Sequence, residues 1–310
     1  MKQIRIATRG SKLAMIQAEL VAGLLRNLRS DLEISFIAVT TKGDRDKSDF
    51  LHKSDARGVF TSEVEAALLD GRADVAVHSL KDLPTTGTPD LVIAAVPPRE
   101  NPADVLAASE KVCSLSDLPV GAAIGTSSPR RIALLHHFRS DLKTVPLRGN
   151  VETRVRKVAD GEIDAAVLAF AGLKRLGLTE KMSATLDPHE FLPAPGQGAL
   201  AVQARAGDNE LIELVSQIND KHTRIATEAE RNVLHAMHGG CRIPLGTYAR
   251  VIDDKLIIDA MIADLNGRTL IKRSSSATLD KAKSCAEKLA EELLTSGGRE
   301  ILSQVRETDY

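Results

Sequence analysis

Short apolar segments alternate with segments of helical spacing over the first two thirds of the chain, and this alternation limits the possible folds more than any other feature. Residues 4–8 form the first expected strand, and apolar side chains then recur at helical spacing from Leu13 to Leu28, behind Ser11 as N-cap. The alternation continues to a strand expected at residues 199–203. It predicts α/β sheets that are mostly parallel and doubly wound.

Two proline-rich segments, residues 97–102 and 193–198, interrupt this alternation, and prolines end both strands and helices. We therefore expect the chain to leave one lobe and return to it. Residues 1–98 and 198–216 would form the first lobe, and residues 99–197 the second.

From about residue 209 the pattern changes to two helices, a hairpin that turns at Asp253 and Asp254, a third strand and a helix at residues 280–296. This order predicts a small α+β domain over residues 217–310. Cys285 falls in the apolar stripe of the last helix, so we expect it in the core.

Composition excludes several classes of function. The 310 residues are 43% hydrophobic and 27% charged, which is typical of a soluble globular protein. A net charge of −1 and 3% aromatic residues argue against a nucleic-acid partner. Three cysteines without a framework spacing, and a start without the apolar core of a signal peptide, favour the cytoplasm. No apolar run approaches a membrane span, so we expect no membrane partner.

A glycine-rich loop presents Cys241. Gly239 and Gly240 precede it, Arg242 follows it, and His238 lies nearby. Basic neighbours lower the pKa of a thiol, and the thiolate is the reactive form. The cysteine is either the anchor of a covalent group or an inert residue of a tight turn, and the loop alone does not decide between them.

Arginines beside glycine, serine or threonine follow several expected strands. They are Arg9, Arg130, Arg131, Arg148 and Arg175, and Arg154 lies in the first turn of the next expected helix, one turn from the Arg148 loop. Ligands of open α/β sheets bind at the carboxyl ends of strands, and a guanidinium group matches a carboxylate in two hydrogen bonds. We expect about two of these arginines to cap helices or pair with surface acids. The others would line a cleft for a ligand with several carboxylates or phosphates.

Asp82 is an acid among these basic positions, next to Lys81 at the end of an apolar strand. Its carboxylate could stabilise a cation that forms during a reaction, or it could simply form the turn before Leu83 and a proline. His78 ends the same strand and is expected to be a packed structural residue. The pairs His136–His137 and His235/His238 lack convincing metal partners, so we predict no metal site.

Seven segments follow one another along nearly the whole chain. They are TRGSKLA at 8–14 with Gln17, VHSLKDLP at 77–84, GTSSPRR at 125–131, RGNVETR at 148–154, LKRL at 173–176, PGQG at 195–198 and GGCRIPLG at 239–246. On these segments the chain resembles the porphobilinogen deaminase (hydroxymethylbilane synthase) family of transferases. The resemblance implies two lobes like those of periplasmic binding proteins and a small third domain.

The resemblance also implies a reaction in tetrapyrrole (haem) biosynthesis. Four porphobilinogens are joined head to tail, ammonia leaves at each step, and hydrolysis frees hydroxymethylbilane. The implied cofactor is a dipyrromethane held by a thioether to Cys241. Each pyrrole carries an acetate and a propionate, which would explain the arginines. The implied protein is a cytoplasmic monomer.

Site roles follow from the same resemblance. Asp82 would bind pyrrole N–H groups and stabilise the positive azafulvene left when ammonia departs. The six arginines would hold carboxylates. Further binding residues would be Ser11, Gln17, Arg57, Phe60, Ser79, Lys81, Thr126, Ser127, Ser128 and Gln197.

One segment departs from the family. Where the family usually has Gly-Gly-Lys-Gly, residues 55–58 are Asp-Ala-Arg-Gly, so Arg57 keeps the charge while two glycines are lost. The shape of residues 41–58 is therefore left open. The competing class is a two-lobed receptor or sensor for small anions, which the third domain and its Cys241 loop disfavour.

Overall fold

The computed structural model describes residues 2–40, 61–108, 112–237 and 243–308. The chain divides into two compact units. The first comprises residues 1–100 and 199–224, and the second comprises residues 101–198 and 225–310. The first division falls within the proline-rich segment 97–102, the second directly follows the segment 193–198, and the third falls inside helix α8 (Lys221–Ala236).

The first unit is built on a five-stranded sheet in the order β2-β1-β3-β10-β4. Its strands are β1 (Gln3–Arg9), β2 (Glu33–Val39), β3 (Val75–Ser79), β4 (Leu91–Ala95) and β10 (Leu200–Arg205). β1 pairs in parallel with β2 and β3, whereas β10 runs antiparallel to both of its neighbours. The sheet is thus parallel except for the strand that begins where the chain re-enters the unit.

In the described part of this unit, three helices accompany the sheet: α1 (Lys12–Leu28), α3 (Ser62–Leu69) and α7 (Asn209–Ser216). The expected start of α1 is confirmed, because the Ser11 hydroxyl accepts a hydrogen bond from the Ala14 N–H at 3.3 Å. Val21 and Leu25 on its apolar face pack into the core around Ile4. This packing fixes the helix directly behind the end of β1.

The second unit repeats the same plan in a sheet of order β7-β6-β8-β5-β9. Its strands are β5 (Asp104–Ala108), β6 (Ala123–Gly125), β7 (Lys143–Val145), β8 (Ala165–Ala169) and β9 (Ala184–Thr185), and its helices are α4 (Pro129–Phe138), α5 (Val151–Ala159) and α6 (Phe170–Arg175). Strands β6, β7 and β8 are parallel, and β5 is antiparallel to β8 and β9. The predicted α/β fold class is confirmed for both sheets, with one reversed strand in each.

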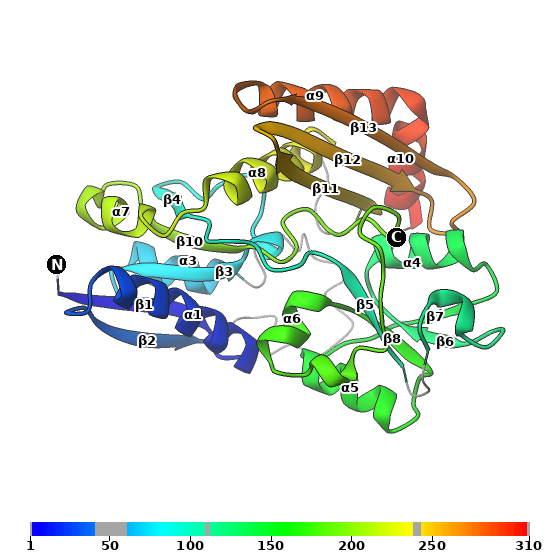
Figure 1. The fold of residues 1–310 in the computed structure, drawn as a ribbon, viewed down its shortest axis with the longest axis horizontal. Coiled ribbons are helices and arrows are strands. Elements are labelled where there is room, and N and C mark those ends of the chain that lie inside the picture. The colour runs from blue at the N-terminus through cyan, green and yellow to red at the C-terminus, as the bar shows by residue number, and fades with distance from the viewer. Residues whose placement is uncertain (1, 41–60, 109–111, 238–242, 309–310) are drawn as a thin grey trace. The chain divides into compact units, whose positions relative to one another are not determined.

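A third, antiparallel sheet belongs to the second unit and has the order β11-β12-β13. It consists of β11 (Leu245–Ile252), β12 (Lys255–Ala263) and β13 (Leu270–Thr278), followed by α9 (Ala282–Leu293) and α10 (Arg299–Thr308). The expected hairpin is present, with positive φ angles of 48° at Asp253 and 55° at Asp254 that suit a tight two-residue turn. Helix α9 lies along this sheet (Figure 1), and Cys285 is buried there as expected.

The third sheet shares a hydrophobic core with the second five-stranded sheet, although the sequence suggested a domain boundary between them. Met261 of β12 packs with Phe191 and Leu192, which lie in the segment between β9 and β10. The buried Glu230 carboxylate accepts the N–H groups of Gly196 and Ala249, each at 2.7 Å. The expected limits of the three domains remain a prediction, because apolar contacts and hydrogen bonds join the last two.

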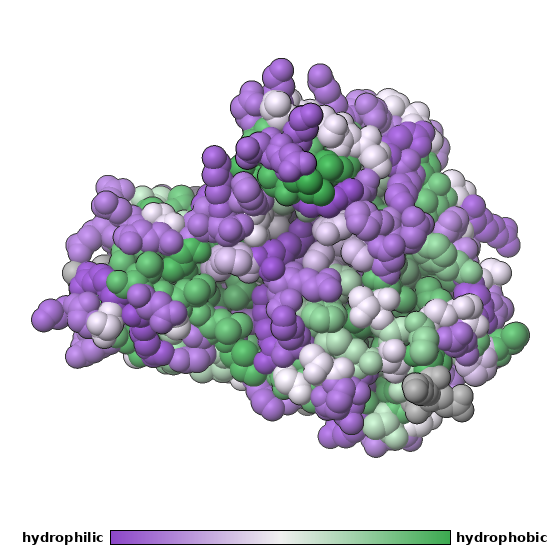
Figure 2. Space-filling view, viewed as in Figure 1, coloured by the Kyte–Doolittle hydropathy of each residue, from purple (hydrophilic) through white to green (hydrophobic). Residues whose placement is uncertain are grey.

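Amphipathic helices give the molecule its outer surface. Figure 2 shows hydrophilic side chains over much of the visible face, with patches of apolar side chains between them. The apolar faces of the helices are turned to the sheets, as helical spacing of apolar residues predicts. Strands β5 and β9 and helix α10 were not expected; β9 has only two residues, and α10 lies beyond the last clear apolar stripe.

Candidate functional site

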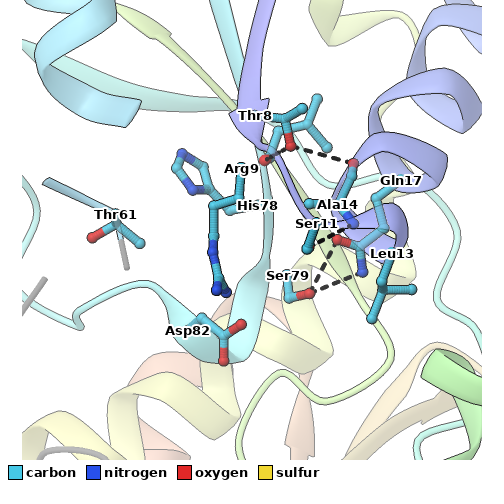
Figure 3. A pocket seen from close by; sticks show the side chains of 11 residues that line it. Thr8, Arg9, Ser11, Leu13, Ala14, Gln17, Thr61, His78, Ser79 and Asp82 are labelled. Carbon is cyan, nitrogen blue, oxygen red and sulfur yellow. Dashed lines mark hydrogen bonds between the residues drawn. The ribbon is translucent and has the colours of Figure 1, made fainter. Parts of the chain in front are cut away.

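A pocket in the first unit lies at the carboxyl ends of the parallel neighbours β1 and β3 (Figure 3). Its wall includes Arg9 at the end of β1 and Ser11 beyond it, Gln17 from α1, Ser79 at the end of β3 and Asp82 beyond it. The last of these closes a single 3-10 turn, Leu80–Asp82, that also carries Lys81. The pocket thus brings together polar residues from the ends of two neighbouring strands.

Hydrogen bonds hold the wall of this pocket in place. The Gln17 amide group donates to the Ser79 hydroxyl at 2.9 Å, which joins α1 to the end of β3. The buried Thr8 hydroxyl lies 3.2 Å from the Ala14 carbonyl and 3.4 Å from the Val77 carbonyl. Each of these side chains has a hydrogen-bond partner within the protein, so this wall of the pocket is ordered before a ligand binds.

Arg9 and Asp82 give the pocket opposite charges. Both side chains point into it in Figure 3, and Asp82 is exposed at the end of its turn. A guanidinium group can bind a carboxylate through two hydrogen bonds, while a carboxylate can accept N–H groups or stabilise a nearby cation. The pair can therefore bind a ligand that carries both a carboxylate and an N–H group.

His78 lies at the back of the pocket and is 6% exposed. Burial lowers the pKa of His78 to about 4, against a small opposing effect of Gln203. The imidazole is therefore neutral at neutral pH, and its Nε2 atom has no hydrogen-bond partner within the described part of the chain. This agrees with the structural role expected for His78.

Acid should destabilise the protein through His78. The unfolded chain binds a proton near pH 6.5 and the folded chain only near pH 4, so stability falls as pH falls through this window. Between pH 7 and pH 4.5 the loss should be about 2–3 kcal/mol in free energy of unfolding. Urea unfolding at both pH values would measure this loss. It should be absent from His78→Gln and present in the control His222→Gln, which replaces an exposed histidine. Equal acid sensitivity of the two variants would contradict the assignment.

The second unit gathers polar residues at the ends of its own parallel strands. Thr126, Ser127 and Ser128 follow β6, Arg148 follows β7, and Arg175 ends the helix after β8. The Ser127 hydroxyl accepts the Leu147 N–H at 3.0 Å, which ties the β6 loop to the residue before Arg148. Ser127 therefore helps to hold the loop that carries Arg148.

The other predicted residues here also have internal partners. The Thr126 hydroxyl accepts the Ser128 N–H at 3.2 Å. Arg154 donates to the Gly149 carbonyl at 2.9 Å, and Arg175 donates to the Gly198 carbonyl at 2.7 Å. Each contact fixes a side chain or loop beside the strand ends.

Arg130 and Arg131 are turned toward an internal acid, and their expected contact with a ligand stays a prediction. They are 3% and 7% exposed, and both contact the buried carboxylate of Asp104 at 2.7 Å. Burial alone would raise the pKa of Asp104, but the charges of Arg130 and Arg131 outweigh it and hold that pKa well below its usual range. The first partner of both arginines is thus an internal acid.

Gln197 is likewise turned inward and is 1% exposed. Its amide group donates to the Pro102 carbonyl at 2.7 Å and to Asp104 at 2.9 Å. Sequence reasoning missed Asp104, which opens the unexpected strand β5. The available signal was an acid directly before the apolar run Val105–Ala108 in sequence, since a buried strand rarely begins with an unpaired charge.

Three residues predicted from the resemblance, Arg57, Phe60 and Cys241, lie outside the described residues. The structure therefore says nothing about their positions.

Two family models match the chain. The first, described as porphobilinogen deaminase, dipyromethane cofactor binding domain, matches residues 4–213. The second, described as porphobilinogen deaminase, C-terminal domain, matches residues 224–295. Together they account for most of both units.

Curated relatives are similar over nearly their whole length. The porphobilinogen deaminase of Syntrophomonas wolfei is 45% identical over 306 residues, covering 99% of this chain and all of the relative. That of Syntrophotalea carbinolica is 43% identical, covering 97% of this chain and 95% of the relative. Among solved structures, a substrate binding domain of a putative amino acid ABC transporter from Streptococcus pneumoniae covers 70% of this chain and 91% of its own, at 15% identity and a TM-score of 0.43.

Proposed function

The chain belongs to the porphobilinogen deaminase family, and from this premise we propose how its residues share the work of the reaction. The enzyme is a transferase that joins four porphobilinogens into hydroxymethylbilane and releases ammonia. Its cofactor is a dipyrromethane. When bound, this cofactor supplies a primer of two pyrroles to which the substrate units are added.

Buried charge in the second unit fits a cofactor that carries carboxylates. Arg130 and Arg131 share one acid, Asp104, and the Nε atoms of both arginines have no partner among the described residues. The cluster thus has one positive charge in excess, which a nearby carboxylate would balance. We assign cofactor and product carboxylates to Arg130, Arg131, Arg148, Arg154 and Arg175, assisted by Thr126, Ser127 and Ser128.

Cys241 is proposed as the attachment point of the cofactor, through a thioether, because its segment matches that of the family. Arg57 and Phe60 are proposed to contact the ligand, as their positions in the family pattern suggest. Gln197 would act indirectly, by holding Asp104.

Asp82 is the proposed catalytic residue. Its carboxylate would accept pyrrole N–H groups and stabilise the positive charge that develops on the substrate as ammonia leaves. Arg9 would bind a substrate carboxylate in the same pocket, with Ser11, Gln17, Ser79 and Lys81 completing the binding surface. The observation that carries this proposal is the meeting of Arg9 and exposed Asp82 in one pocket at the ends of β1 and β3.

Replacing Arg9 tests the substrate-binding role. A hydrogen bond to a charged group contributes about 1.5–3 kcal/mol, so kcat/KM for porphobilinogen should fall about 10- to 100-fold in Arg9→Gln. Ammonia release and hydroxymethylbilane formation would be measured together. Arg5→Gln is the matched control, because Arg5 lies on the same strand but pairs with Asp74 at 2.8 Å. Equal kcat/KM for the two variants would refute the role of Arg9.

The remaining partner assignments are proposals. Porphobilinogen is the substrate of the family, whereas we propose that the chain acts as a cytoplasmic monomer with neither nucleic acid nor membrane as a partner. None of the helices in the described ranges is long and apolar enough to cross a membrane. The alternative, a non-catalytic receptor for small anions, predicts binding of porphobilinogen without ammonia release, and family membership does not favour it.

A further inference from the structure

Asp104 is the centre of a buried polar cluster in the second unit. Its side chain is fully buried at the start of β5. One carboxylate oxygen accepts a hydrogen bond from Arg130 Nη1 at 2.7 Å. The other accepts from Arg131 Nη2 at 2.7 Å and from Gln197 Nε2 at 2.9 Å. A single carboxylate therefore holds both guanidinium groups and the amide group.

Main-chain carbonyl groups provide further contacts to each guanidinium group. Arg130 Nη1 also donates to the Leu192 carbonyl at 2.8 Å, and Arg131 Nη1 donates to the Val167 carbonyl at 2.8 Å. These contacts come from different segments of the unit, so the arginines have little freedom to turn. Asp104 lies between the two side chains and sets their separation.

Asp104 also sets the charge of the cluster. Among the described residues it is the one acid in contact with Arg130 and Arg131, so two positive charges meet one negative charge. Without Asp104 the two guanidinium groups would repel each other in a buried site. With it, the cluster has a single excess charge, which matches one ligand carboxylate.

We propose that Asp104 is a positioning residue for the reaction, which orients Arg130 and Arg131 and limits their excess charge so that they can receive one carboxylate of the pyrrole ligand. This inference rests on the proposed binding role of the two arginines. Asp104 does not itself touch the ligand; it acts through them. Gln197 supports it by occupying the oxygen shared with Arg131.

The central test is Asp104→Asn, which keeps size and removes charge. Apo-protein would be incubated with porphobilinogen, and the fraction of chains with a two-pyrrole adduct would be measured by intact mass. We expect this fraction to fall about tenfold or more at early times, as is typical when a charged hydrogen-bond partner is lost. For loaded chains, KM should rise more than kcat falls, because the arginines bind and do not react.

A double-variant cycle separates positioning from a merely structural role. If Asp104 acts through Arg131, Asp104→Asn should reduce loading much less in an Arg131→Gln background than in the wild-type chain. If the two substitutions reduce the loaded fraction by independent factors that multiply in the double variant, the proposal is overturned. All loading would be measured below the melting temperature of each variant.

Asp141→Asn is the matched control, because Asp141 pairs with Arg139 at 2.7 Å at the other end of α4. It removes an aspartate–arginine pair just beyond the C-terminus of the same helix and should load cofactor like the wild-type chain.

A second variant is used if Asp104→Asn does not fold. Gln197→Met leaves both arginine contacts with Asp104 in place but removes one hydrogen bond to that carboxylate, and it should slow loading several-fold.

The outcomes also separate this inference from the proposed function. A wild-type chain that forms no adduct would contradict the proposed function itself. A wild-type chain that loads normally, together with a folded Asp104→Asn that loads equally fast with unchanged KM, would refute the positioning role alone. If Asp104→Asn does not fold, normal loading of Gln197→Met would refute it.

Discussion

The Cys241→Ala variant is expected to carry no pyrrole adduct and to lose all measurable formation of hydroxymethylbilane. The reason is chemical, since alanine has no sulfur with which to form a thioether. A tethered primer also keeps one reactant at the site through every step, which raises its effective concentration. Without the anchor, each elongation would depend on repeated binding of free intermediates.

Intact-protein mass spectrometry measures the adduct, and product formation measures turnover. The control is Cys113→Ala, because Cys113 is an exposed cysteine that forms no disulfide bond within the described residues. It should keep both the adduct and activity. An active Cys241→Ala chain, or an adduct that follows Cys113, would exclude the proposed anchor.

The Asp82→Asn variant is expected to lower kcat by about 10²–10³, the typical effect of removing one preorganised electrostatic group. Asparagine keeps the shape of the side chain but lacks the negative charge that would stabilise a cation beside it. Asp82 is well placed for this, because a short turn directly after β3 presents it in the pocket.

Kinetics on chains whose adduct has been confirmed by mass would isolate the catalytic step from cofactor assembly. Asp90→Asn is the matched control: Asp90 is an exposed acid of the same unit with a positive φ of 62°, which asparagine also tolerates. It should leave kcat unchanged. Near-normal kcat in Asp82→Asn would remove Asp82 from the catalytic role.

Local patterns were enough to predict much of the architecture. Helical spacing and the Ser11 cap identified α1, and the Asp253–Asp254 turn identified the last hairpin. Polar residues after apolar strands pointed to Arg9 and Asp82, because carboxyl ends of neighbouring parallel strands meet at one edge. Each of these signals lies within a few residues of the feature it predicts.

The inward-facing residues could not be predicted in this way. Arg130 and Arg131 carry the same local signals as Arg9, yet their guanidinium groups contact Asp104. Asp104 lies 26 residues from Arg130 and 93 from Gln197 in sequence. A local motif shows that an arginine follows a strand, but it does not show which way the side chain turns.

By itself, then, the sequence determined the alternation of strands and helices, the polar strand ends and the family. The tertiary structure alone decided the reversed strands β5 and β10, the common core of the last two sheets, and the buried cluster around Asp104. The physical reason is that burial and charge compensation depend on segments that meet only after folding. The free energy of a buried guanidinium group is set by partners far away in the chain.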